Sequence, residues 1–135
     1  MLLNMLKGRI HRAVVTQAEP DYAGGITIDG YLMEEAGIHE YEQVQVVDVD
    51  NGLRLETYAT TGKRSSGVVC LNGAAARTVQ PGDKLIITAY ALMAPEEADV
   101  SLPRVVFVNG RNQVSRVTRC ERHGRLEDME RLEGV

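Results

Sequence analysis

Five polar side chains at predicted strand ends and turns could bind or process a small acid. Arg9 and Arg54 are candidates for a carboxylate, because an arginine binds it through two parallel hydrogen bonds. Tyr58 could deliver a proton, with Thr57 beside it. Asn72 could donate a hydrogen bond to a developing oxyanion. Each side chain alone fits equally well a solvated polar group on a strand, so the elements that position them have to be considered.

Short β-like runs separated by turns dominate the chain. An Asp-Asn-Gly turn at 50–52 and an Asn-Gly turn at 109–110 are strong hairpin signals. One short helix is predicted at 31–36, before Gly37, and a single helical turn at 74–76. The runs predict a mainly β barrel or sandwich, with strands at 9–16, 26–28, 44–49, 53–60, 67–71, 84–93, 104–108 and 113–117.

Composition narrows the class of protein. A length of 135 residues fits one domain, and 44% apolar with 25% charged residues is ordinary for a globular protein. The net charge of −4 argues against a general nucleic-acid binder. No run of about 18 apolar residues and no secretory signal is evident, so we expect a cytoplasmic protein that does not span a membrane. Cys70 and Cys120 lack CxxC spacing and the histidines are scattered, so no metal site is predicted.

The C-terminal end differs from the rest. From Arg119 onward the chain is dense in charge of both signs and poor in β-branched residues. We therefore expect a barrel domain at 1–117 and a charged tail at 118–135 that is a frayed helix or disordered.

Five segments identify a possible family. They are MLKGRIHRAVVTQAE at 5–19, DYAGGITID at 21–29, NGLRLETYA at 51–59, LNGAAAR at 71–77 and PGDKLIITAYA at 81–91. In their order and spacing the chain resembles the pyruvoyl-dependent aspartate 1-decarboxylases, from residue 1 to about residue 113. The resemblance implies a double-psi β-barrel with short helices, assembled as a homotetramer with active sites between subunits. It also implies conversion of L-aspartate to β-alanine and CO2 for pantothenate and coenzyme A synthesis, with a possible maturation factor.

The resemblance assigns roles to individual residues. Arg54 matches the arginine that binds a substrate carboxylate, and Tyr58 matches the proton donor. Arg9 stands where the family usually has a lysine near the substrate, and a planar guanidinium is not equivalent to a compact ammonium. Other matching positions line the substrate site or assist self-cleavage: Asn72, Gly73, Ala74 and Ala75 for the substrate, and Thr57, Asn72, His11 and Tyr22 for processing. For His11 a structural hydrogen bond is an equally good interpretation.

The pair Gly24-Gly25 departs from the family pattern. The family has Gly-Ser there; the serine hydroxyl attacks the carbonyl of the preceding glycine, the chain is cut, and the new N-terminus becomes the pyruvoyl cofactor. Gly25 has no hydroxyl, so the resemblance predicts an uncut, inactive precursor without the pyruvoyl group. Thr27 is a poor substitute because no glycine precedes it.

Three interpretations stay open at this point. A glycine introduced in place of the serine would trap the precursor. A natural pseudoenzyme would bind a small dicarboxylate or a protein partner. A different barrel, such as a transcription-factor-like swapped-hairpin dimer, fits the charge and the NGAAA segment less well.

Overall fold

The computed structural model describes residues 1–121 and 124, and most of the predicted tail lies outside the described residues. Strands dominate, so the prediction of a mainly β protein with short helices is confirmed. In chain order the elements are β1 (Leu3–Val14), β2 (Gln17–Glu19), β3 (Ile26–Asp29), α1 (Gly30–Ala36), β4 (Gln43–Asp48), β5 (Arg54–Gly62), β6 (Val69–Asn72), the 3-10 helix η1 (Gly73–Thr78), β7 (Lys84–Met93), α2 (Pro95–Val100), β8 (Arg104–Val108) and β9 (Val114–Thr118).

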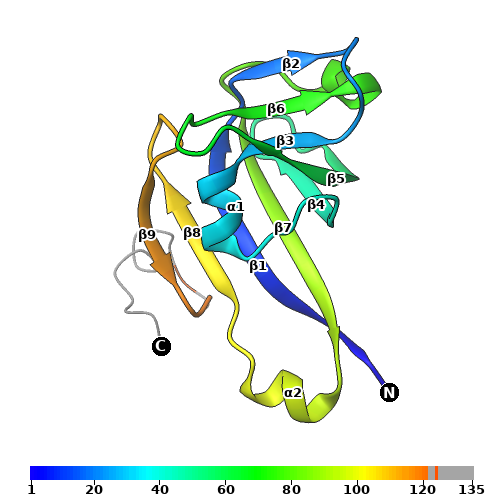
Figure 1. The fold of residues 1–135 in the computed structure, drawn as a ribbon, viewed down its shortest axis with the longest axis vertical. Helices are drawn as coiled ribbons and strands as arrows, with labels where there is room; N and C mark the ends of the chain where they lie inside the picture. The colour runs from blue at the N-terminus through cyan, green and yellow to red at the C-terminus, as the bar shows by residue number, and fades with distance from the viewer. Residues whose placement is uncertain (122–123, 125–135) are drawn as a thin grey trace.

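The strands form one mixed nine-stranded sheet in the order β2-β6-β3-β5-β4-β7-β1-β8-β9. Three pairs are parallel, namely β1 with β8, β2 with β6 and β3 with β5. Parallel neighbours need crossover connections, and these carry the chain from one end of the sheet to the other. Figure 1 shows β2, β3 and β6 at one end of the long axis and α2 near the N-terminus at the other.

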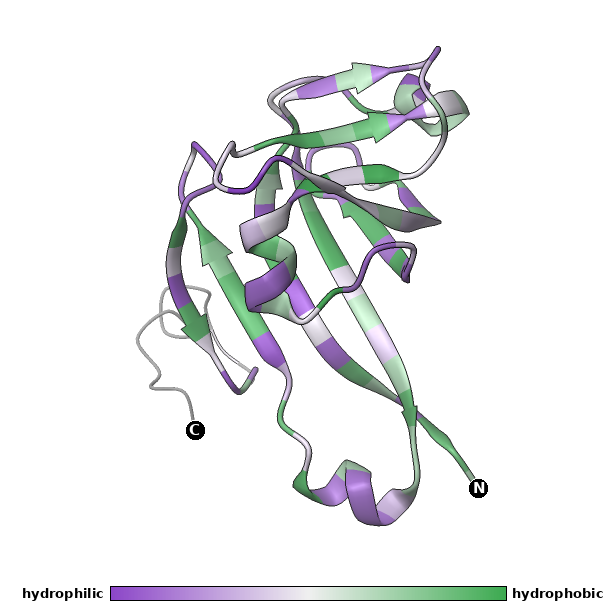
Figure 2. Ribbon diagram, in the orientation of Figure 1, coloured by the Kyte–Doolittle hydropathy of each residue, from purple (hydrophilic) through white to green (hydrophobic). Residues whose placement is uncertain are grey.

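Alternation along the strands separates a buried face from an exposed one. In β4, Val44 and Val46 are buried, whereas Gln43 is exposed and Gln45 half-buried. The core is built from β-branched and leucine side chains that are shielded from solvent, among them Ile10, Ile26, Ile28, Leu71, Leu85 and Ile87. Figure 2 shows the apolar colour following β6, β7 and β8 and the polar colour on α2. The polar side chains of β4 and β5 are thereby left on the outer face.

The local signals in the sequence proved good guides. β4 and β5 pair antiparallel around the turn at 50–52, and β8 and β9 pair antiparallel around the turn at 109–110, as predicted. Helix α1 spans nearly the predicted residues and ends at Gly37, which has a φ of 71°. The single turn predicted at 74–76 is η1.

Two elements were missed by the predictions. Strand β2 is only three residues long and polar, so no periodicity reveals it, and its pairing with distant β6 defines it. Helix α2 begins at Pro95 and carries Glu96 and Glu97 in its first turn, which are helix-start signals that the sequence did contain. No helix in the described part of the chain has the length and apolarity to cross a membrane.

A buried carboxylate ties helix α1 to the loop after β5. Asp29 Oδ1 accepts from the backbone N–H groups of Tyr31 and Ser65, and Oδ2 accepts from the N–H of Gly67, each at 2.8 Å. The side chain thus caps the helix and fixes the loop that leads into β6. This loop and helix flank β3, the strand that directly follows the glycine pair.

Candidate functional site

Tyr58 of β5 covers the Gly24-Gly25 pair. Gly25 is buried with a φ of +91°, and a Cβ built there would lie 2.8 Å from the Tyr58 carbonyl oxygen and 2.9 Å from its ring Cε2. A Cβ built at Gly24 would lie 3.5 Å from the Tyr58 hydroxyl oxygen. The backbone at residue 25 therefore has a conformation and a contact distance that favour glycine.

The start of η1 holds the glycine pair from its other side. The Asn72 backbone N–H donates to the Gly25 carbonyl at 2.9 Å. The Asn72 side-chain Nδ2 donates to Thr27 Oγ1 at 2.9 Å, and the Cys70 thiol donates to Asn72 Oδ1 at 3.1 Å. The buried Asn72 amide is thus fixed beside β3.

A shallow cavity of about 370 Å³ opens beside the pair and is lined by Tyr22, Ala23, Gly24, Thr27, Thr60 and Asn72. Gly73, with a φ of +71°, packs against it, because a Cβ there would lie 3.3 Å from the Gly24 Cα. Ala74 and Ala75 follow in η1, Ala74 exposed and Ala75 half-buried. Of the predicted processing and substrate residues, the structure thus places Tyr22, Asn72 and Gly73 around Gly24-Gly25.

The two arginines lie in a different cavity of about 600 Å³. Its lining includes Arg9, Gln45, Arg54, Thr88 and Glu121, and it shares no lining residue with the cavity beside Gly24. Cross-strand register explains the grouping, because Arg9 pairs with Thr88 of β7, and Thr88 pairs with Gln45 of β4.

Strand β5 connects the two cavities. Arg54, Glu56 and Tyr58 alternate on its exposed face, and Thr57 lies on the opposite face. Tyr58 follows Arg54 by four positions, which is about 13 Å of backbone at about 3.3 Å per residue. The predicted site is therefore present in one chain as two separate halves.

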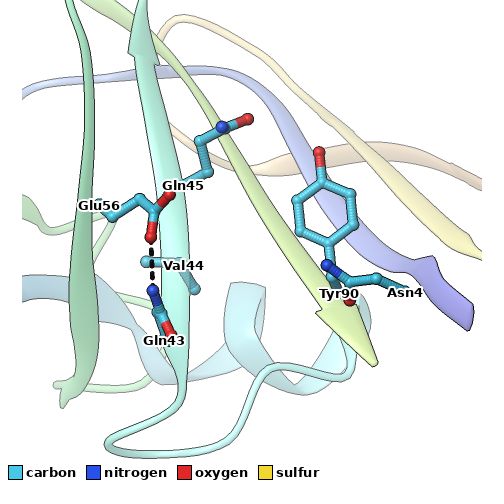
Figure 3. Close-up of a pocket in the computed structure, with 6 residues that line it drawn as sticks. All are labelled: Asn4, Gln43, Val44, Gln45, Glu56 and Tyr90. Carbon is cyan, nitrogen blue, oxygen red and sulfur yellow. Dashed lines mark hydrogen bonds between the residues drawn. The ribbon is translucent and has the colours of Figure 1, made fainter. Parts of the chain in front are cut away.

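A third cavity adjoins the arginine cavity on the same sheet face. Figure 3 shows the Gln43 amide directed at the Glu56 carboxylate, a hydrogen bond of 2.5 Å, with Gln45 and Tyr90 nearby. Gln45 and Tyr90 line both cavities, so the polar face continues from one to the other.

His11 is a buried neighbour of Arg9 and does not reach the glycine pair. Arg9 Nη2 lies 3.2 Å from His11 Nδ1, and the ring packs edge-on against Phe107 at 5.5 Å between centroids. An arginine nitrogen can only donate, so Nδ1 accepts and the proton of the neutral ring sits on Nε2. Burial, followed by the charges of Arg9 and Arg12, lowers the pKa of His11 from 6.5 to about 4. The structural interpretation of His11 is thus favoured over a catalytic one.

We expect the His11 ring to stay neutral down to about pH 4 in an NMR titration. Because the unfolded chain binds this proton below pH 6.5 and the folded chain does not, His11 costs stability as pH falls from 6.5 to about 4. Arg9→Gln should raise the pKa only partly, since burial remains. A wild-type titration midpoint near 6.5 would contradict this environment.

A comparison with known families decides where the chain belongs. The family model described as Aspartate decarboxylase matches residues 1–115. The chain belongs to the aspartate decarboxylase family. A protein from Clostridium beijerinckii named Aspartate 1-decarboxylase is 63% identical over 121 residues, covering 90% of this chain and 98% of the relative. One of the same name from Clostridium kluyveri is 55% identical over 127 residues, covering 94% and 100%.

Membership of the aspartate decarboxylase family confirms the double-psi β-barrel that the sequence resemblance implies, and the mixed nine-stranded sheet agrees with it. Among solved structures, the crystal structure of the rationally designed mkDPBB_sym_86 protein has 17% identity and a TM-score of 0.46, covering 66% of this chain and 98% of that one.

Two cysteines and a cluster of three aspartates lie outside the linings of these cavities. Cys70 and Cys120 are free thiols, and burial raises the pKa of Cys70. Asp48, Asp50 and Asp83 have carboxylate oxygens within 4.8 Å of one another, but each carboxylate also accepts from backbone N–H groups of its own turn or of β7. Burial and a hydrogen bond to Asp83 raise the pKa of Asp48.

Proposed function

We propose that this chain is an aspartate decarboxylase-family protein that folds as an uncut, inactive precursor. Gly25 carries the proposal, because it occupies the position of the family's cleaving serine and has neither a Cβ nor a hydroxyl. The relatives named Aspartate 1-decarboxylase imply L-aspartate as the family substrate, with β-alanine and CO2 as products.

The residues present do not fit the pyruvoyl cofactor. The group derives from a serine, and the position holds a glycine whose missing Cβ would meet Tyr58 at 2.8 and 2.9 Å. The Tyr58 ring thus occupies space that a side chain at residue 25 needs. No decarboxylation step is therefore derived for the chain as it stands.

The remaining residues retain the capacity to bind a small acid. Arg54 is exposed at the start of β5, and within residues 1–121 no hydrogen bond or ion pair engages its guanidinium. We assign to Arg54 the binding of a ligand carboxylate, since an unpaired guanidinium offers parallel donors. To the Tyr58 hydroxyl, close to Gly24, we assign the place of the family's proton donor.

We further propose that the functional assembly is a homotetramer in which a second copy brings the two half-sites together. Arg54 lines a cavity that shares no lining residue with the cavity beside Gly24, so within one chain the two groups of residues lie apart. Exposed aromatic side chains favour an interface on this region, with Tyr22 at 58%, Tyr58 at 40% and Tyr90 at 42% exposure. The neighbouring copy would then face its arginine cavity toward the glycine pair.

A second candidate function is that of a pseudoenzyme that binds a small dicarboxylate. The cavity that contains Arg9 and Arg54 favours this function, because it is present although the chain lacks the serine at position 25 that the chemistry requires. This function shares the fold and the binding residues of the first and differs only in what the protein does in the cell.

The test is an intact mass of the purified chain under denaturing conditions, combined with an assay for β-alanine. We expect one species of 14.8 kDa and no product from L-aspartate. Under native conditions the same sample should give the mass of four chains. Fragments of 24 and 111 residues from cutting after Gly24, or β-alanine formation, would refute the proposal.

A further inference from the structure

Arg9 already holds a carboxylate from its own chain. Its Nη1 lies 2.5 Å from Oε1 of Glu121, a residue 112 positions away at the edge of the predicted tail. The Arg9 side chain is 20% exposed and that of Glu121 is 38% exposed. The pair therefore sits at the mouth of the arginine cavity, which both residues line together with Arg54.

The other nitrogens of Arg9 are turned away from the cavity mouth. Nη2 faces His11, whose neutral ring accepts from it, and Nε is buried. Nη1 is therefore the guanidinium nitrogen that is left to bind a ligand, and it is the nitrogen that binds Glu121. A carboxylate from outside that binds Arg9 in the same way has to displace Glu121.

We propose that Glu121 is an internal ligand that sets the affinity and specificity of the arginine cavity for carboxylates. This inference rests on the proposed function of the cavity as a carboxylate site. With Glu121 in place, Arg9 is neutralised and Arg54 is left as the cation for one carboxylate. A dicarboxylate that uses both arginines has to compete with Glu121, whereas a monocarboxylate bound at Arg54 does not.

The charges of the side chains that line the arginine cavity agree with this difference between dicarboxylates and monocarboxylates. Among the residues that the structure describes, the lining apart from Glu121 consists of the two arginines and neutral side chains: Leu6, Gln45, Val47, Ile86, Thr88 and Tyr90. Removal of Glu121 raises the formal charge of the lining from one positive charge to two. Another carboxylate on the same sheet face, that of Glu56, accepts from Gln43 in the adjoining cavity. Of the described lining residues, Glu121 is therefore the one that can compensate the charge of Arg9.

The experiment compares succinate with propionate as probes, by calorimetry on the full chain. Glu121→Gln keeps the size of the side chain and removes its charge. We expect it to bind succinate about fivefold more tightly than the wild type, since a partly exposed ion pair is worth at most about that factor. Propionate affinity should change less than twofold. Glu56→Gln, the matched control on the same face, should change neither affinity.

Arg54→Ala separates failure of this inference from failure of the proposed function. It should weaken both acids about tenfold or more, because it removes a charged hydrogen-bond donor. If Arg54→Ala does so while Glu121→Gln leaves succinate unchanged or strengthens both acids equally, Glu121 is not an internal ligand and the carboxylate site stands. If Arg54→Ala changes nothing, or if no variant binds either acid, the carboxylate site itself is rejected and the inference with it.

Discussion

The Gly25→Ser variant is expected to cut itself after Gly24 into fragments of 24 and 111 residues, while Gly25→Ala stays whole. Serine supplies the hydroxyl that the family uses against the preceding carbonyl, and Gly24, the residue that carries this carbonyl, is present. Asn72 already holds the Gly25 carbonyl at 2.9 Å, so the loop is fixed on the far side of the bond to be cut. Denaturing mass spectrometry over a time course measures the cut fraction.

The two variants share a steric cost that the wild type avoids. Both place a Cβ at a φ of +91° and within 2.9 Å of Tyr58. We expect each folded, uncut variant to lose about 1–3 kcal/mol of unfolding free energy through backbone strain, with a melting temperature lower by several degrees. Gly25→Ala is thus the control for the backbone strain. The difference in cut fraction between Gly25→Ala and Gly25→Ser measures the effect of the hydroxyl alone.

An uncut but folded Gly25→Ser chain would contradict the view that one missing hydroxyl accounts for the inactivity. The obstacle would then be Tyr58, whose ring and carbonyl oxygen occupy the space next to residue 25. A chain that is cut but makes no β-alanine would instead indicate that Arg9 prevents activity, because its guanidinium replaces the family's lysine.

The sequence predicted more of the fold than of the arrangement of the site. The reason is that the fold signals act between neighbours in the chain, whereas the site depends on contacts between distant strands. Hairpins at 50–52 and 109–110 are local, since Gly52 with its φ of +77° and the Asn-Gly turn specify them within a few residues. The alternation in β5 likewise places Arg54 and Tyr58 on one face. Such features depend on neighbours in the chain, so a single sequence reveals them.

The parts that escaped prediction depend on pairing between distant strands. The separation of Arg9 from the glycine pair follows from the order β5-β4-β7-β1, which periodicity does not encode. The contact between Arg9 and Glu121 joins residues 112 positions apart. The hydrogen bond from the Asn72 side chain to Thr27 needs the antiparallel register of β3 and β6.

Gly8 shows how such a long-range contact can decide whether the barrel forms at all. It lies in β1 at a register shift between Leu6 and Gly8, where the end of helix α1 packs on the strand. A Cβ built at Gly8 falls on the carbonyl oxygen of Ala36 and lies 3.1 Å from its carbonyl carbon. Both atoms belong to the backbone, so no side-chain rotation relieves the overlap, and the helix has to move off the strand.

We therefore expect Gly8→Ala to cost more than about 4 kcal/mol of unfolding free energy, a large part of the roughly 5–15 kcal/mol that stabilises a typical domain. Circular dichroism during urea unfolding measures this cost. Gly110→Ala is the matched control, because a Cβ there meets nothing within 4 Å, and its effect should stay within about 0.5 kcal/mol. A Gly8→Ala chain that unfolds at the wild-type urea concentration would mean that α1 does not rest on β1.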